Sequence, residues 1–144
     1  MENTKVEVLN IDDLVPYPGN PMKHPDDQIR LLVDGIRKYG FRQPILVDEN
    51  RVIITGHGRL QAAKAAGLTT VPVIFARGMS EADVRAYRVA DNKLARKSSW
   101  DIEALSKEIS DLADLDFDLS LTGMSDDEIE MMVNPTSRAP LRAA

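Results

Sequence analysis

Apolar and polar residues alternate near the amino terminus and predict a first strand. Residues 5–11 follow a period of two, as expected of a strand with one buried face. The Pro- and Gly-rich stretch 15–21 cannot form regular structure. A helix is predicted over 26–39, because acidic residues open the segment, Gly40 ends it and apolar residues recur at helical spacing. Those apolar residues are Ile29, Leu32, Val33, Ile36 and Tyr39.

A hairpin and a glycine turn are predicted in the middle of the chain. The β-branched runs 44–47 and 52–55 flank a polar turn and predict two paired strands. The second run ends at Gly56, and the segment 60–66 is rich in helix formers and closed by Gly67. A strand is therefore expected to pass through a glycine turn into a helix.

The rest of the chain is predicted to be mostly helical. One more strand is expected over 71–75, followed by a helix over 80–97 that opens with a capping-box sequence. Ser99 and Ser125 are each predicted to cap a further amphipathic helix. The overall pattern predicts an α+β fold, a small mixed sheet with packed helices followed by a short helical annex.

The charge distribution divides the chain after Lys97. Residues 1–97 carry 15 Lys and Arg against 12 Asp and Glu, whereas residues 98–144 carry 3 against 11, so the formal charges are +3 and −8. We therefore predict a basic domain over 1–97, an acidic helical annex over 98–134 and a disordered tail over 135–144. An anionic ligand is expected on the basic domain.

Composition excludes several classes of protein. The chain has no cysteine, which excludes disulfides, thiolate zinc sites, iron–sulfur clusters and cysteine nucleophiles. It also has no apolar run of about eighteen residues, and its polar start lacks the layout of a secretory signal. A cytoplasmic protein without membrane association is expected.

The stretch 55–59, with the sequence Thr-Gly-His-Gly-Arg, carries the most chemistry. A glycine turn that opens a helix presents backbone N–H groups and a positive dipole end to an anion. Gly56 and Gly58 allow close approach of the backbone, Arg59 offers a fork of donors, and His57 offers one more. Phosphate is the predicted ligand. The alternative is an ordinary turn whose arginine pairs with an acidic neighbour.

Two other segments carry candidate ligands. Asp91 and Asn92, next to Lys93, supply the hard oxygen atoms that magnesium prefers beside phosphates. The alternative is that they are exposed polar residues of an amphipathic helix. Asn20 and His24 lie in the loop before the first long helix, where donors can face a ligand, and the alternative there is a loop cap.

In their order and connecting elements, these segments resemble the ParB N-terminal domain, whose fold is shared with sulfiredoxin and a free-serine kinase. The resemblance covers roughly residues 6–97. It rests on Asn20-Pro21, Gln43-Pro44-Ile45, Gly56-His57-Gly58-Arg59 and Asp91-Asn92. The Gly-His-Gly-Arg and Asp-Asn-Lys sequences look most like the ParB-like domains of phages and mobile elements, many of which are labelled ParB-like nuclease domains.

The resemblance implies a protein that binds CTP or ATP with Mg²⁺ and is a candidate NTPase. The implied nucleotide-binding residues are Asn20, His24, Gln43, Thr55, Gly56, His57, Gly58, Arg59, Asn92 and Lys93. Asp91 and Asn92 are the implied metal ligands, and Asp91 and His57 the implied catalytic residues. His57, Gly58 and Ala95 depart from the motifs of the partitioning proteins, so the preferred base is left open.

Three alternatives remain. The first is a magnesium-dependent DNA nuclease, in which Asp91 and His57 act on a phosphodiester. The second is a small-molecule kinase of the free-serine type, with Asp26, Asp27 or Asp91 as the base. The third is a non-catalytic interaction module whose acidic tail contacts a basic partner. Sulfiredoxin activity is excluded, because that chemistry needs a cysteine.

The partners implied by the leading hypothesis are those of DNA-processing machinery in a phage or mobile element. They are a nucleotide, DNA bound without strong sequence specificity, a DNA methyltransferase or other phage protein, and a second copy of the chain. The annex is expected not to read a DNA sequence, because it is strongly acidic. Its apolar stripes are expected to be buried by packing or by a partner.

Overall fold

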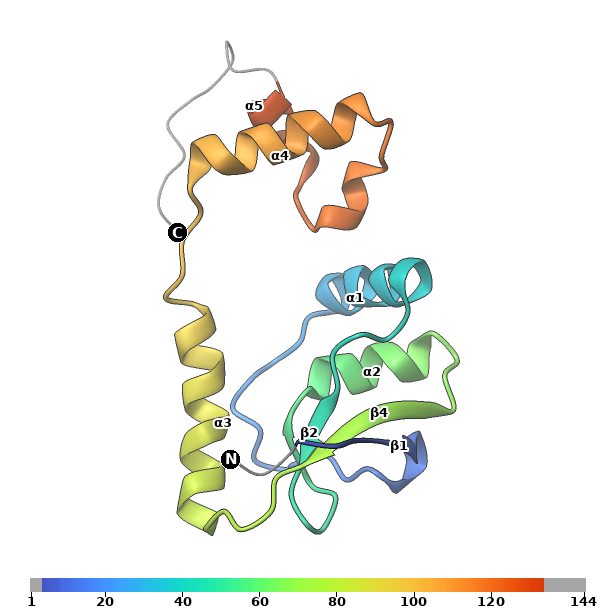
Figure 1. Cartoon of the computed structure of the whole chain (residues 1–144), viewed down its shortest axis with the longest axis vertical. Helices are drawn as coiled ribbons and strands as arrows, with labels where there is room; N and C mark the ends of the chain where they lie inside the picture. Colours follow the sequence, from blue (N-terminus) through green and yellow to red (C-terminus); the bar gives the residue numbers. More distant parts are fainter. Residues whose placement is uncertain (1–3, 134–144) are drawn as a thin grey trace. The chain divides into compact units, whose positions relative to one another are not determined.

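The computed structural model describes residues 4–133 and shows an α+β fold, as predicted (Figure 1). Contacts along the chain divide it into two compact units between Lys97 and Ser98. Within residues 4–133, no helix is long and apolar enough to cross a membrane. The predicted tail at 135–144 lies outside the described residues.

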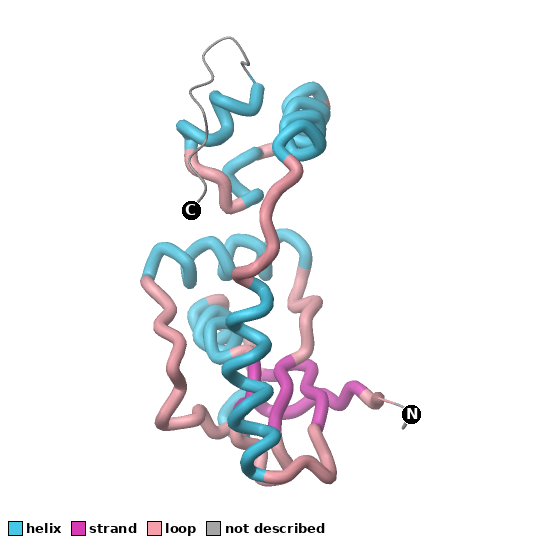
Figure 2. Tube along the Cα trace, turned by 90° about the vertical axis from the view of Figure 1, so that its left-hand side faces the viewer, coloured by secondary structure: helices cyan, strands magenta, loops and turns pink. Residues whose placement is uncertain are grey.

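The first unit contains a four-stranded sheet and three α-helices (Figure 2). Its elements are β1 (Val6–Asn10), η1 (Ile11–Asp13), α1 (Asp26–Tyr39), β2 (Ile45–Val47), β3 (Ile53–Thr55), α2 (His57–Ala65), β4 (Thr70–Phe75) and α3 (Glu81–Ala95). The strand order is β1-β4-β2-β3, with β2 and β4 parallel and the other two pairs antiparallel. β3 is therefore an edge strand.

Most predicted elements of this unit are confirmed, with bounds that differ by one or two residues at several ends and by more at the start of α2. α1 has the predicted bounds, and Gly40 follows it with φ 81°. The second helix begins at His57 and not near Leu60, because Gly56 adopts a left-handed conformation and serves as its N-cap. His57, Gly58 and Arg59 thus form the first turn of α2.

The core of this unit lies between the sheet and α2. Ile45, Val47, Ile53 and Val73 are fully shielded from solvent in the sheet, and Leu60 of α2 belongs to the same cluster. Buried β-branched residues on three strands explain why such short strands hold their register. This packing fixes the point at which β3 passes into α2.

The second unit is helical, with α4 (Ile102–Asp114), η2 (Leu119–Thr122) and α5 (Asp126–Val133). Asp101 caps α4 by accepting from the Ala104 N–H, so the prediction of a Ser99 cap is wrong. Ser125 and Glu128 form the predicted capping box of α5, with reciprocal hydrogen bonds of 3.1 and 3.0 Å.

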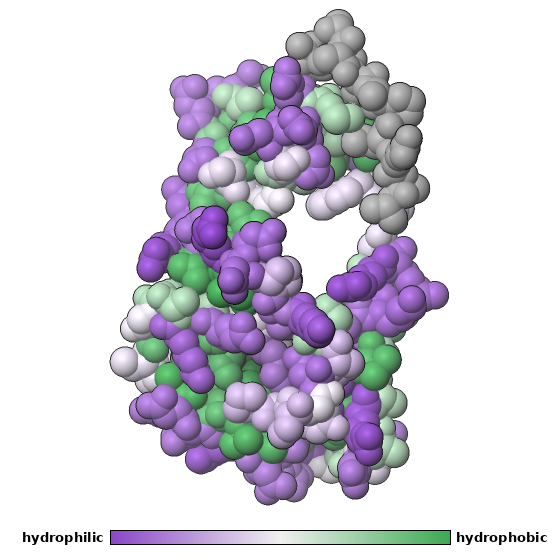
Figure 3. Space-filling model, turned by 180° about the vertical axis from the view of Figure 1, so that it is seen from behind, coloured by the Kyte–Doolittle hydropathy of each residue, from purple (hydrophilic) through white to green (hydrophobic). Residues whose placement is uncertain are grey.

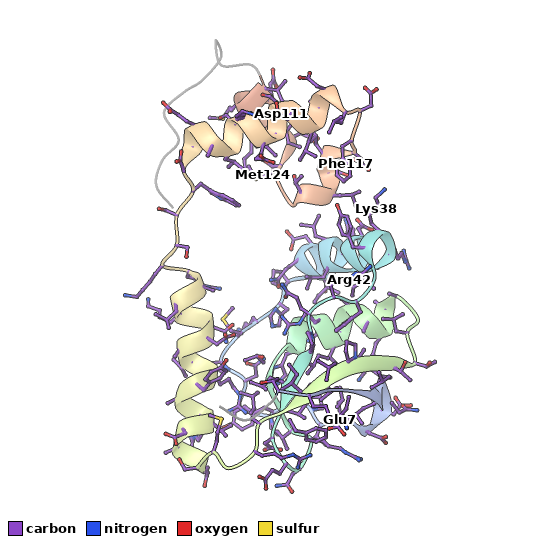
Figure 4. All side chains as sticks on the ribbon, in the orientation of Figure 1. Glu7, Lys38, Arg42, Asp111, Phe117 and Met124 are labelled. Atoms are coloured by element: carbon purple, nitrogen blue, oxygen red, sulfur yellow. The ribbon has the colours of Figure 1, made fainter. Side chains whose placement is uncertain are left out.

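The apolar stripes of the second unit pack partly against each other. Ile109 of α4 and Met132 of α5 are each only 2% exposed. The Ser106 hydroxyl lies 3.0 Å from the Met132 sulfur, which joins the two helices. Lys107 forms an ion pair with Asp111 on the exposed side of α4 (Figure 4). Hydrophilic side chains cover much of the face of this unit that Figure 3 shows.

We expect two glycine substitutions to have opposite effects on stability. Gly35 lies inside α1 with no atom within 4 Å of a Cβ, so Gly35→Ala should raise the free energy of unfolding by about 0.5–1 kcal/mol. Gly56 has φ +108°, and a Cβ there would lie 3.1 Å from Ile45 Cγ1. Gly56→Ala should therefore lower the free energy of unfolding by about 1–3 kcal/mol.

Urea denaturation of both variants measures these changes. Gly67→Ala is the matched control for Gly56→Ala, because Gly67 also has positive φ, at +81°, but has open space around its Cβ position. An equal loss in Gly56→Ala and Gly67→Ala would mean that the contact with Ile45 contributes nothing.

Candidate functional site

One cavity of about 180 Å³ gathers the chemistry-bearing residues of the first unit. Its lining consists of Asn20, Met22, His24, Gln28, Leu32, Gln43, Ile54, Thr55, Gly56, His57, Gly58, Arg59, Asp91 and Asn92. The structure therefore brings together the residues predicted for a nucleotide site except Lys93, which is exposed on α3 and does not line the cavity. Their roles as ligands stay predictions.

The amino-terminal turn of α2 forms one wall of this cavity. An α-helix leaves its first backbone N–H groups without intrahelical partners, and here these groups belong to His57, Gly58 and Arg59. Since the helix dipole places partial positive charge at the same end, this wall suits an anion.

The His57 side chain is buried and holds the loop before α1. Its Nε2 atom accepts a hydrogen bond of 3.1 Å from the Tyr17 N–H. Burial is the largest cause that lowers the pKa of His57 from its ordinary 6.5 to about 4, and the neighbouring Arg88 and His24 side chains contribute to the same shift. The ring is thus neutral at pH 7. Its Nε2 atom accepts from Tyr17 and does not donate to a phosphate, contrary to the prediction that the side chain offers a donor there.

Gly58 has a structural role besides the one predicted for it. A Cβ at this position would lie 2.9 Å from Nδ1 of His24, so the glycine makes room for the His24 ring. That ring also shares a 2.8 Å hydrogen bond with the Gln28 side chain. The imidazole of His24 therefore lies against the first turn of α2 and lines the same cavity.

Arg59 lines the cavity while holding the strand that precedes it. Its Nη1 donates to the Gln43 side chain at 3.2 Å and its Nη2 to the Pro44 carbonyl at 3.1 Å. Its Nε is buried with no hydrogen-bond partner among the described residues. Burial lowers the pKa of Arg59, while the nearby Asp91 carboxylate opposes that shift. A guanidinium has five N–H donors, so Arg59 keeps donors that its bonds to Gln43 and Pro44 do not use.

Asp91 and Asn92 reach the cavity from α3. The Asn92 amide nitrogen donates to the Arg88 carbonyl at 2.8 Å, which leaves the amide oxygen for a ligand. No cluster of three or more His, Asp or Glu side chains among the described residues could hold a metal alone. These two oxygen ligands suit Mg²⁺ that is held mainly by phosphates, the usual arrangement for this ion in nucleotide sites.

The sequence reasoning missed Arg88 and Tyr17, which lie beside the cavity. Arg88 is 3% exposed, its Nη2 donates to the Ile53 carbonyl at 3.1 Å, and its guanidinium lies 3.6 Å from the centre of the Tyr17 ring. The available signal was an arginine four residues after Val84, on the inner face of the predicted helix. The spacing of apolar residues predicts which apolar side chains are buried, and it does not indicate that an arginine on the same face is buried as well.

The fold and the cavity define a small α+β domain with an anion-suited helix end beside a polar helix, α3. The chain belongs to the ParB N-terminal domain family, which it matches over residues 1–92. It also matches the ParB-methyltransferase HTH domain over residues 103–140. This second match falls largely on the predicted acidic helical annex, residues 98–134.

Named relatives extend this family assignment. The chain is 36% identical over 80 residues to the ParB-like nuclease domain-containing protein YnaK of Escherichia coli, covering 56% of this chain and 92% of YnaK. It is 40% identical over 91 residues to the stage 0 sporulation protein J of Bacillus subtilis, covering 60% of this chain and 32% of that protein. The chain thus spans about a third of the length of this second relative.

A solved structure supports the fold. The C-terminally truncated chromosome-partitioning protein ParB of Caulobacter crescentus, complexed with CTP-γ-S, matches with a TM-score of 0.66 and 21% identity. The match covers 90% of this chain and 71% of that one. At this identity, the likeness establishes the fold alone.

The lowered pKa of His57 predicts a loss of stability in acid. Between about pH 6.5 and about pH 4, the unfolded chain binds a proton at this residue and the folded chain does not, so falling pH favours unfolding. The free energy of unfolding should fall by about 3 kcal/mol through this residue across that window. His57→Gln, which keeps an acceptor for the Tyr17 N–H, should lose this pH-dependent increment.

Urea denaturation at pH 7 and pH 4.5 compares the two proteins, so that titrating carboxylates cancel in the difference. NMR titration of the wild-type ring measures the pKa directly. A His57 pKa near 6.5 in the folded protein would overturn the lowered pKa and the predicted loss of stability in acid.

Proposed function

We propose that residues 1–97 bind a nucleoside triphosphate, CTP or ATP, with Mg²⁺ in this cavity. The observation that carries the proposal is that the open turn of α2, Arg59 and the side chains of Asp91 and Asn92 line a single cavity. Family membership supports it, as does the CTP-γ-S bound to the partitioning protein of C. crescentus.

Each wall of the cavity has a distinct role in this proposal. The N–H groups at 57–59 and the guanidinium of Arg59 contact the phosphates. The oxygens of Asp91 and Asn92 hold Mg²⁺ against those phosphates, and the metal neutralises their charge. Asn20 and His24 face the ligand from the loop on the other side. Asp91 and His57 are the residues proposed to act if the bound nucleotide is hydrolysed. Asp91 is exposed, and its carboxylate would orient the attacking water. The His57 side chain is engaged with Tyr17, so this residue would contribute its backbone N–H.

A magnesium-dependent nuclease is the second candidate, supported by the likeness to YnaK. It places the same Asp91 and Mg²⁺ against a phosphodiester. The sparse metal ligands of the described residues favour the nucleotide, because a triphosphate supplies ligands that a single phosphodiester lacks. Plasmid DNA incubated with the protein and Mg²⁺, then run on a gel, distinguishes the two.

For the second unit, we propose contact with a basic protein partner of DNA-processing machinery. Residues 98–133 carry 11 acidic residues against Lys107, a formal charge of −10. The HTH match supports a role near DNA, yet this charge repels phosphates. The proposed partners are a DNA methyltransferase or another phage protein. A second copy of this chain is also proposed as a partner. A cytoplasmic location is part of the same proposal.

Arg59→Ala should weaken binding of CTP or ATP tenfold or more, since a charge-assisted phosphate contact contributes about 1.5–3 kcal/mol. It should also cost some stability, because Arg59 donates to Gln43 and Pro44. Isothermal titration calorimetry with CTP, ATP, GTP and UTP in Mg²⁺ measures affinity and base preference. Arg42→Ala is the control, an exposed arginine that donates to the Tyr39 carbonyl and does not line the cavity (Figure 4). Unchanged affinity in Arg59→Ala would remove this residue from the site.

Asn92→Ala should reduce the Mg²⁺-dependent part of nucleotide binding more than the part measured in EDTA, because its amide oxygen is the proposed metal ligand. Titrations with and without Mg²⁺ measure the two parts. If both fall equally, Asn92 contacts the nucleotide directly or supports the fold instead.

Removing the second unit should leave the nucleotide site intact, because every residue that lines the cavity lies within 20–92. A protein ending at Lys97 should bind nucleotide within about threefold of the full chain, a difference below 1 kcal/mol. A soluble truncated protein without affinity, where the full chain binds, would show that the second unit completes the site.

A further inference from the structure

α3 is held to the first unit by an unusual contact. Within α3, all of which the structure describes, Arg88 alone is buried. The large apolar side chains of the same helix stay open to solvent, with Tyr87 at 44%, Val89 at 56% and Leu94 at 63% exposure. Val84 is only partly buried, so Arg88 supplies the one fully buried side chain by which α3 is held to the first unit.

The partners of Arg88 explain how an arginine can do this. β3 is an edge strand, and an edge leaves backbone groups without partners in the sheet. Arg88 Nη2 donates to one such group, the Ile53 carbonyl, while its guanidinium stacks on the Tyr17 ring. Cation–π contacts of this kind strengthen when they are removed from water.

Tyr17 connects this contact to two walls of the cavity. Its N–H donates to Nε2 of His57 in the first turn of α2, and its carbonyl accepts from the Asn20 N–H at 3.1 Å. On the other side, the Arg88 carbonyl accepts from the Asn92 amide. One pair of side chains thus links α3, the first turn of α2 and the Asn20 loop.

We propose that Arg88 and Tyr17 are positioning residues for the candidate site: their stacked contact holds Asn92 on α3 in register with the first turn of α2. This inference rests on the proposed nucleotide binding. Neither side chain needs to touch the nucleotide, since Arg88 and Tyr17 do not line the cavity. Their effect on affinity passes through Asn92, Asn20 and His57.

Substitutions at Arg88 and Tyr17 separate the stacking contact from the rest of the fold. Arg88→Met keeps the length and removes the charge, Tyr17→Leu removes the ring, and Tyr17→Phe keeps it. Arg85→Ala is the matched control, an arginine one turn earlier on α3 whose side chain is 66% exposed. Should Arg88→Met fail to fold, Arg88→Lys and the two Tyr17 variants still test the stack.

The first measurement needs no ligand. Amide hydrogen exchange should accelerate tenfold or more over residues 89–95 in Arg88→Met and in Tyr17→Leu, while Tyr17→Phe and Arg85→Ala stay near wild type. Exchange in the sheet should stay unchanged in every variant. Equal exchange of α3 in Arg88→Met and wild type would overturn the inference, whatever the nucleotide results are.

The second measurement is affinity for CTP and ATP with Mg²⁺. Arg88→Met and Tyr17→Leu should each weaken binding tenfold or more. The double variant should bind nucleotide no more weakly than either single variant, because both substitutions remove the same contact. Arg88→Met should also be non-additive with Asn92→Ala, a result that general loss of stability does not produce. Wild-type affinity in Arg88→Met, or full additivity in both double variants, would overturn the inference. If the wild-type protein binds neither nucleotide, the proposed function itself fails. Hydrogen exchange needs no ligand, so it still shows in that case whether the Arg88–Tyr17 contact holds α3.

Discussion

The arrangement of the first unit depends on a single backbone constraint, the left-handed conformation of Gly56. β3 is buried in the core, and only one residue separates it from α2, so the helix must begin where the strand ends. A φ of +108° makes this reversal, and glycine adopts it without the strain that a side chain would cause. The open N–H groups of α2 are thereby fixed beside the sheet edge, where α3 and the loop through Asn20 meet them.

Burial decides which polar groups of the site remain available. His57 and Arg59 both lose affinity for protons because they are removed from water, yet the consequences differ. The imidazole becomes neutral and serves the Tyr17 N–H, whereas the guanidinium keeps its charge and has donors left over. The two residues that looked alike as phosphate donors therefore separate into a ring that holds the Tyr17 loop and a charged side chain that lines the cavity.

The two units differ in charge as much as in fold. The first carries the anion-suited cavity and an excess of basic residues, whereas the described part of the second has a formal charge of −10. A match to an HTH domain and a strongly acidic surface are hard to reconcile with reading DNA through phosphate contacts, because those contacts need cations. The protein partner proposed for the second unit would be consistent with both observations.

The sequence by itself determined most of the secondary structure and most of the residues that line the cavity. Period-two runs, helical spacing and cap residues depend on near neighbours, so α1, the hairpin and the Ser125 capping box could be predicted. The boxes at Asn20, Gly56 and Asp91 likewise indicated one ligand. Tertiary structure decided what each member does: the His24 ring explains Gly58, and the stack of Arg88 on Tyr17 joins residues 71 positions apart. No local pattern encodes these contacts, because desolvation and stacking arise only when distant segments are packed together.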